Sequence, residues 1–207
     1  MAAADQPTKV SRTSLAGRTD FTIIGQIIEP RSKVLDLGCG EGELLAWLVE
    51  NKRVLARGVE ISAQQVRKAI GRGVSAYQGD IDEGLADYPD GAFDYVILSQ
   101  TLQETRSPLQ VLKEMLRVGR RAIVSFPNFG HWEVRRAMVF TGQAPKTKLF
   151  PYDWYNSPNI HFLSINDFED LCRESGFPIE KRYFLSGARR VKRMPNLLAQ
   201  TAVFLLG

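Results

Sequence analysis

Short apolar runs alternate with segments of helical spacing along most of this chain. The short runs are typical of strands that are buried on both faces of a sheet, and they lie at 34–37, 56–60, 74–78, 93–98 and 121–126. The segments between them repeat apolar residues at helical spacing, at 43–51, 62–72 and 108–119. Strands that alternate with helices in this way predict a doubly wound α/β fold, with a mostly parallel sheet between two layers of helices.

Further elements are expected at both ends of this pattern. A helix from Asp20 to Glu29, with Asp20 as its N-cap, precedes the first strand. Another helix, capped by Ser164, extends to Ser175. Two last apolar runs predict strands at 179–185 and 197–206.

The first strand leads directly into a glycine-rich loop, and Val34–Leu44 reads VLDLGCGEGEL. Its glycines let the backbone turn sharply and approach a ligand closely. The carboxylates of Asp36, Glu41 and Glu43 would repel the pyrophosphate of NAD or FAD, and the G-x-G-x-G spacing differs from G-x-G-x-x-G. S-adenosylmethionine instead carries an ammonium and a sulfonium. The loop therefore favours S-adenosylmethionine, with NAD or FAD as the minority alternative and a glycine turn that binds nothing as another.

Polar residues follow the next strands at the same edge of the predicted sheet. Glu60 ends the second strand, about twenty residues past the loop, where an acid accepts both ribose hydroxyls. Its alternative is an ordinary surface glutamate. Asp80 follows the third strand and could accept a proton from an adenine amino group, or simply cap a turn. The fourth strand delivers Ser99 to the ligand face.

The regular alternation stops between Pro127 and Phe162. This insertion holds 8 of the chain's 20 aromatic residues, interleaved with arginine and lysine. Such surfaces are favoured at protein interfaces, which indicates a covering or docking role. The compatible alternative is a loop that folds back over the sheet edge and buries its own rings. We expect residues 1–18 to be largely disordered and 19–207 to form one domain with an insertion at 127–162.

The insertion also contains His131, the first candidate for a general base near a bound methyl donor. A histidine between Phe129 and Trp132 is more often structural, and that alternative stays open. Tyr152 and Tyr155 are weaker candidates. Methyl transfer depends mostly on position and line of attack, so the lack of a recognisable catalytic motif does not exclude an enzyme.

Charge and cysteine content narrow the classes of protein. The 27 basic and 23 acidic residues give a net charge of +4, which is too mild to indicate nucleic acid binding. The basic loop Arg189–Arg193 is interpreted as a solvated hairpin tip, with binding of RNA or an acidic partner as the minority alternative. Cys39 and Cys172 lack a C-x-x-C partner, so no metal site or disulfide is expected. Without a membrane-spanning run or a signal peptide, the chain is expected to be cytoplasmic and to have no membrane contact.

The combination of VLDLGCGEGEL, an acid after the second strand, Gly79-Asp80 and the strand ending at Ser99 resembles the class I S-adenosylmethionine-dependent methyltransferase fold. The resemblance covers about residues 20–206 and implies a seven-stranded, mostly parallel sheet whose last strand is antiparallel. It implies that S-adenosylmethionine, or S-adenosylhomocysteine, binds at the strand ends. The expected cofactor-binding residues are Asp36, Gly38, Cys39, Gly40, Glu60, Ile61, Asp80, Ile81 and Ser99.

Three stretches outside the cofactor motifs carry a narrower resemblance. YVILSQTLQETRSP, IVSFPNFGHWEVR and PYDWYNSPNIHFLSINDFEDLC are similar to the MetW family of methionine biosynthesis proteins. That resemblance implies a bound accessory or activating partner of homoserine O-acetyltransferase. The alternative is an S-adenosylmethionine-dependent methyltransferase acting on a small molecule under the insertion. The loop after the fourth strand reads Ser99-Gln100-Thr101, unlike the N/D-P-P-Y/F/W loop of enzymes that methylate amino groups of nucleic acids.

Overall fold

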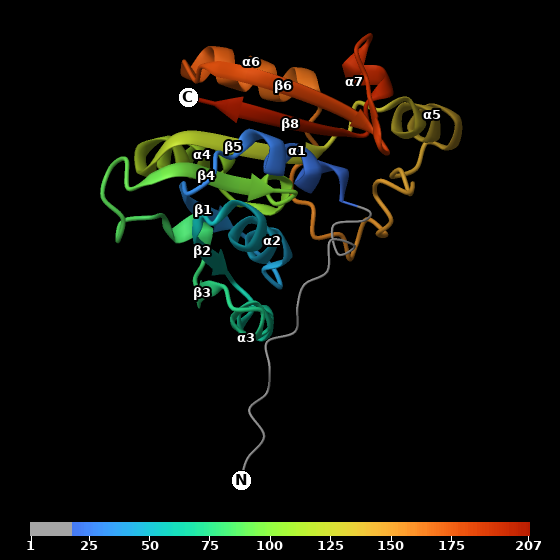
Figure 1. The fold of residues 1–207 in the computed structure, drawn as a ribbon. Helices are drawn as coiled ribbons and strands as arrows, with labels where there is room; N and C mark the ends of the chain where they lie inside the picture. The colour runs from blue at the N-terminus through green and yellow to red at the C-terminus, as the bar shows by residue number, and fades with distance from the viewer. Residues whose placement is uncertain (1–17) are drawn as a thin grey trace.

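The computed structural model describes residues 18–207 and builds them around an eight-stranded sheet (Figure 1). The strands are β1 (Lys33–Leu37), β2 (Leu55–Glu60), β3 (Ser75–Gln78), β4 (Phe93–Ser99), β5 (Gly119–Pro127), β6 (Ile179–Ser186), β7 (Arg189–Arg190) and β8 (Thr201–Leu206). Their order in the sheet is β3-β2-β1-β4-β5-β8-β6-β7. Strands β1 to β5 are parallel, whereas β8 is antiparallel to both of its neighbours, β5 and β6. The expected disorder of residues 1–18 lies outside the described residues except at Arg18.

Helices cover both faces of this sheet. They are α1 (Thr19–Ile27), α2 (Glu43–Lys52), α3 (Ala63–Gly71), α4 (Pro108–Val118), α5 (Trp132–Thr141), α6 (Ile165–Ser175) and the short α7 (Pro195–Leu198). Helices α1 and α2 pack on one face and α4 and α6 on the other, and each face has its own apolar cluster. Within residues 18–207, every helix is too short or too polar to cross a bilayer.

Alternation of side chains along the central strands explains the two clusters. On β4, Val96 and Leu98 pack against α4, while Tyr95 and Ile97 pack against α1 and α2. Since a central parallel strand is buried on both faces, it reads as a nearly continuous apolar run. The predicted mostly parallel sheet with an antiparallel last strand is confirmed.

The C-terminal region differs from the predicted pattern in two ways. An eighth strand, β7, forms because Gly187 turns the chain with a positive φ and Arg190 then pairs with Leu185. The predicted strand at 197–206 is wrong at its start: Pro195 begins a helical turn, and β8 begins only at Thr201.

Helix α1 also differs from prediction, because Asp20 is not its N-cap. Arg18 occupies the capping position, and Asp20 lies inside the first turn with a buried side chain. The helix ends at Ile27 because Ile28 is extended. In contrast, the predicted cap of α6 is confirmed: Ser164 accepts from the Asp167 backbone, and the Asp167 side chain accepts from the Ser164 backbone.

The 127–162 insertion contains α5 and then an irregular segment. Part of it folds back on itself: the Phe129 ring packs against Phe150 and Phe162 at centroid distances of 5.3 and 4.7 Å. Other aromatic side chains of the segment are exposed. The insertion therefore combines both structural alternatives, and its docking role stays a prediction.

Close packing at Gly58 gives a first prediction. Gly58 pairs with Asp36 on β1, and a methyl group there would collide with the Cys39 side chain. We expect Gly58→Ala to lower the free energy of unfolding by about 1–3 kcal/mol, measured by urea denaturation. The control Gly71→Ala, whose added methyl meets nothing within 4 Å, should leave stability unchanged or raise it slightly. Equal effects of the two substitutions would contradict this packing.

Candidate functional site

The loop after β1 is held open and close to β2 by its glycines and backbone. Gly38, Gly40 and Gly42 have φ values of 71°, 56° and 75°, which side chains disfavour. The amides of Gly38 and Cys39 both donate to the Val59 carbonyl, at 2.8 and 3.0 Å. Helix α2 begins directly afterwards at Glu43. The loop thus presents backbone and no bulky side chains at the carboxyl end of the sheet.

Two adjoining cavities, of about 470 and 310 Å³, lie at this end of the sheet and share Arg18, Gly38, Gly40 and Ser99. All nine residues expected from the sequence line one or both of them. The larger is lined by Gly38, Gly40, Glu60, Ile61, Asp80, Ile81 and Ser99, and the smaller by Asp36, Gly38, Cys39, Gly40 and Ser99. Their role as ligand contacts stays a prediction.

Asp36 is the most unusual of these residues. Its side chain is 3% exposed, and its Oδ1 atom has no hydrogen-bond partner among the described residues. Burial raises the pKa of Asp36 to about 8, against the lowering effect of Arg18 and with further raising by the charges of Glu60 and Asp20. A buried oxygen without a partner is costly, so this position favours a ligand that brings a donor or a positive charge.

Glu60 is fixed in place by backbone donors. Its Oε2 accepts from the Gly40 amide and its Oε1 from the Ser62 amide, both at 2.9 Å. Each carboxylate oxygen keeps a further lone pair for the hydroxyl groups of a ligand. Ser62 then caps α3 through the Gln65 amide. The second strand, the glycine loop and α3 therefore meet at one carboxylate.

Asp80 has a structural role in addition to its place in the cavity wall. It caps the short 3₁₀ helix η2 (Ile81–Glu83) by accepting from the Asp82 amide at 2.9 Å. Its other oxygen forms an ion pair with Arg106, which also contacts Asp82. The turn-capping interpretation of Asp80 is thus confirmed. Ile61 adds an exposed apolar side chain to the rim of the larger cavity.

Sequence reasoning missed a network of side chains that links α1 to this site. Arg18 donates to both oxygens of Asp20, at 3.0 and 2.9 Å, and to the Ser99 hydroxyl at 3.0 Å. The hydroxyls of Ser99 and Ser125 also donate to Asp20, at 2.9 and 3.3 Å. Burial opposes ionisation of Asp20, but Arg18 and Ser99 outweigh it and lower its pKa. The only signal for this network in the sequence was an acidic residue, Asp20, on the apolar face of the predicted helix.

Two more residues of the cavity wall lie outside the predicted set of cofactor-binding residues. Gln100 is a non-glycine residue with a φ of 56°, held there by bonds from its amide to the Ser125 carbonyl and hydroxyl. Backbone strain of this kind is concentrated at functional sites. Glu104 also lines the larger cavity, and burial together with the charge of Glu60 raises its pKa. The wall is therefore rich in carboxylates and suits a cationic ligand with several hydroxyl groups.

The candidate catalytic residues His131, Tyr152 and Tyr155 do not line the cavities, and the one cysteine that does, Cys39, is unreactive. The Cys39 side chain packs toward Gly58, and burial, with the charges of Asp36 and Glu60, raises its pKa to about 12, so it is an inert thiol. His131 is buried at the start of α5 and is not among the residues that line either cavity. Burial lowers its pKa despite Glu133 nearby. The exposed rings of Tyr152 and Tyr155 do not line the cavities either.

Several solved structures with the same fold carry titles that describe methyltransferases. The model superposes on a possible histamine N-methyltransferase from Thermotoga maritima with a TM-score of 0.65 and 19% identity, covering 91% of this chain and 87% of that one. It also superposes on a chain of the Haloferax volcanii complex between the Trm112 methyltransferase activator and the putative methyltransferase, with a TM-score of 0.69 and 15% identity. That match covers 94% of this chain and 90% of the other. The fold is that of the class I S-adenosylmethionine-dependent methyltransferases.

The chain belongs to the MetW family, since the family model described as methionine biosynthesis protein MetW matches residues 18–206. A relative from Rhodopirellula baltica, the bifunctional methionine biosynthesis protein MetXA/MetW, is 39% identical over 197 residues. That match covers 89% of this chain and 32% of the relative. The ajmaline N-methyltransferase of Rauvolfia serpentina is 33% identical over 98 residues, 44% of this chain and 33% of that one. The chain thus spans about a third of the length of these curated relatives.

The buried carboxyl of Asp36 predicts a pH dependence of stability. The pKa of Asp36 is about 8 in the fold, above its ordinary value of 3.8. The contribution of Asp36 to the free energy of unfolding is therefore full below about pH 4 and is lost as the pH rises through 8. We expect Asp36→Asn to remove this loss. Relative to the unsubstituted chain, the variant should gain stability between pH 5 and pH 8, by up to about 1 kcal/mol per pH unit.

Urea denaturation of both ligand-free chains at pH 5, 6, 7 and 8 measures this difference. Parallel stability profiles for the two chains would show that Asp36 ionises normally in the fold.

Proposed function

We propose that the chain binds S-adenosylmethionine in the paired cavities and acts in methionine biosynthesis as a bound accessory subunit of homoserine O-acetyltransferase. The observation that carries the ligand assignment is the buried Asp36 oxygen without a partner, within a wall of carboxylates. A ligand ammonium supplies the missing donor and positive charge. A pyrophosphate would meet the carboxyl groups of Glu60 and Glu104 in the larger cavity and would bring Asp36 neither a donor nor a positive charge.

The remaining parts of the ligand find matching groups. Arg18 would hold the carboxylate of the methionine end, because its guanidinium lines both cavities and remains partly exposed. Glu60 would accept the ribose hydroxyls, and Asp80 with Ile81 would face the adenine. The sulfonium, when bound, supplies a methyl group that is already activated for transfer. The residues of this chain orient the ligand and exclude water from it.

Calorimetry with S-adenosylmethionine and NAD side by side tests the ligand assignment. We expect S-adenosylmethionine to bind and NAD to give no signal. Asp36→Asn and Glu60→Gln should each weaken binding by roughly 10–100-fold, as expected when a charge-assisted hydrogen bond of about 1.5–3 kcal/mol is lost. The exposed Glu50→Gln on α2 is the matched control and should bind normally. Binding of NAD in preference to S-adenosylmethionine would overturn the assignment.

The partner assignment is supported by the relative whose name joins MetXA to MetW in one chain. It is also supported by the aromatic surface of the insertion, which we define as Trp132, Val139, Phe140, Trp154 and Tyr155. These side chains are exposed, by 81% at Phe140 and 78% at Trp154. Exposed apolar side chains in such number are characteristic of protein interfaces, especially where aromatic rings and arginines occur together.

Arginine is close to this surface. The guanidinium of Arg136 lies 5.1 Å from the Trp132 ring centroid, a cation–π contact at the exposed side of α5. Only Val134 of this helix is buried, so most of α5 is available to a partner. A subunit that covers the aromatic surface would remove from water the apolar area that the isolated chain leaves exposed.

Copurification with homoserine O-acetyltransferase tests the partner. We expect a complex with the unsubstituted chain, and at least tenfold weaker association for the double variant Phe140→Ser with Trp154→Ser. Ile70→Ser, an exposed apolar side chain on α3, is the matched control. The acetyltransferase rate should change when the chain is added, and change again when S-adenosylmethionine is present. Absence of a complex together with an unchanged rate would end this proposal.

A second candidate function is methyl transfer to a small molecule. A third cavity, of about 380 Å³, is favourable for it, because its lining includes Arg18 and Gln100 beside the donor site and Leu149 from the insertion. Incubation with labelled S-adenosylmethionine and cell metabolites should then release S-adenosylhomocysteine. Asp80→Ala should lower that rate through weaker donor binding. No product above the protein-free control would count against an enzyme.

A further inference from the structure

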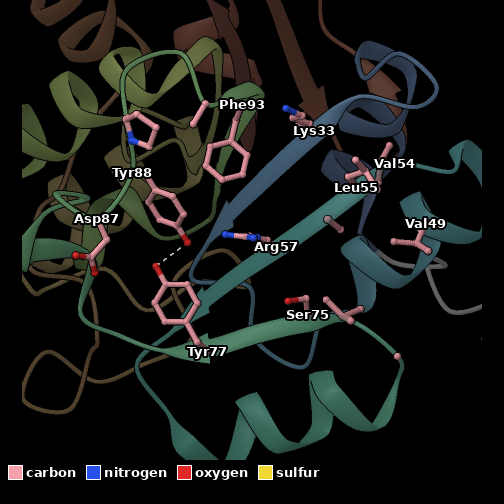
Figure 2. Close-up of a pocket in the computed structure, with 15 residues that line it drawn as sticks. Lys33, Val49, Val54, Leu55, Arg57, Ser75, Tyr77, Asp87, Tyr88 and Phe93 are labelled. Carbon is pink, nitrogen blue, oxygen red and sulfur yellow. Dashed lines mark hydrogen bonds between the residues drawn. The ribbon is translucent and has the colours of Figure 1, made fainter.

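A separate cavity of about 830 Å³ lies at the opposite end of the sheet from the glycine loop (Figure 2). Its wall includes the first residues of four strands: Lys33, Leu55, Ser75 and Phe93. It shares no lining residue with the paired cavities at the carboxyl ends of the strands. The cavity is therefore distinct from the proposed S-adenosylmethionine site.

The cavity exists because one face of the sheet edge is only partly covered. Strand β3 pairs with β2 alone and forms the edge of the sheet. By strand alternation, Leu55 and Arg57 lie on the same face as Val59, which packs into the cluster under α4. Toward the edge, that face is covered only by the segment that carries Tyr88, so Leu55 remains exposed.

Two cations line this cavity without partners. Among the described residues, neither the Arg57 guanidinium nor the Lys33 ammonium forms an ion pair. Figure 2 shows Arg57 directed from β2 toward the hydroxyls of Tyr77 and Tyr88, with Lys33 at another side of the opening. Asp87 is the one carboxylate in the lining, and its oxygens point outward at the rim. Two unpaired cations thus face one carboxylate in the lining of the cavity.

The two tyrosines provide a neutral donor beside Arg57. The Tyr88 hydroxyl donates to the Tyr77 hydroxyl at 3.0 Å, which leaves the Tyr77 proton available to a ligand. Burial, with the charge of Asp87, raises the pKa of Tyr77, so this phenol stays protonated and remains a donor. The Tyr88 ring packs edge-on against Phe93 at 5.1 Å and forms an apolar wall.

We propose that this cavity binds a small organic anion, with its carboxylate or phosphate on Arg57 and the Tyr77 hydroxyl and its apolar or aromatic body against Tyr88, Phe93 and Leu55. Three observations combine in this assignment: unpaired cations, a free phenol donor and aromatic walls. A cavity of this size with a few convergent polar groups is the usual form of a small-molecule site. Arg57 is the anchor because a guanidinium pairs with carboxylate or phosphate through two hydrogen bonds.

The test uses 2-naphthoate as the anionic probe, its neutral analogue 2-naphthalenemethanol, and inorganic phosphate, each titrated into the full chain by calorimetry. We expect 2-naphthoate to bind at least fivefold more tightly than either comparison compound. Arg57→Gln should weaken that binding at least tenfold, and Tyr77→Phe by a smaller factor. Arg67→Gln, an exposed arginine on α3 without an ion pair, is the matched control and should bind normally.

Each outcome decides the proposal. Equal binding of the neutral analogue removes the role of charge, and equal binding of phosphate removes the role of the aromatic wall. Loss of binding in Asp36→Asn or in the Phe140→Ser, Trp154→Ser double variant would place the probe elsewhere and overturn the assignment. Normal thermal unfolding of Arg57→Gln confirms that its lost binding is local. None of these results depends on whether S-adenosylmethionine binds.

Discussion

The burial of acidic side chains at the carboxyl end of β1 is the constraint on which the candidate site depends. Asp36, Asp20 and Glu60 interact electrostatically at the end of the central strands, and the fold counters their repulsion in different ways. Arg18 neutralises Asp20, backbone amides hold Glu60, and Asp36 has the strongly raised pKa. A ligand that brings a hydrogen-bond donor or a positive charge would remove the remaining cost.

The glycine loop is part of the same solution. Its positive φ values bring the Gly40 amide to Glu60 and the amides of Gly38 and Cys39 to Val59. The loop therefore serves the carboxylates as much as it serves a ligand. A side chain on Gly38 would meet Thr101, which follows β4. The loop after β1 and the residues after β4 thus approach closely at the mouth of the cavity because Gly38 has no side chain.

Local patterns in the sequence account for the sheet, the helices that cover it and the cofactor loop. Strands that are buried on both faces appear in the sequence as apolar runs, and the glycine loop is one continuous segment. Both can therefore be predicted from the sequence alone. The Arg18–Asp20–Ser99 network could not be predicted in this way, because Ser99 is 79 residues from Asp20 and 81 from Arg18, and Asp20 looked like a helix cap. The partly uncovered sheet face that carries Arg57 could not be predicted either, because no local sequence pattern shows that the 84–92 segment leaves the sheet edge open. His131 was chosen for its chemistry alone, and the fold buries it away from the cavities.

The connection between β3 and β4 extends from one cavity to the other. Asp80, Ile81 and Asp82 line the larger cavity at the glycine loop, and Asp87, Tyr88 and Pro89 line the cavity at the far end of the strands. Arg106 clasps the first part through Asp80 and Asp82, while Arg117 holds the second through the Tyr88 carbonyl. A ligand that stabilises this connection at one end would change the affinity for a ligand at the other end. Such coupling between two binding sites is reciprocal and equal in size in both directions. If both proposed sites are occupied, this connection is the contiguous segment through which binding at one would influence binding at the other.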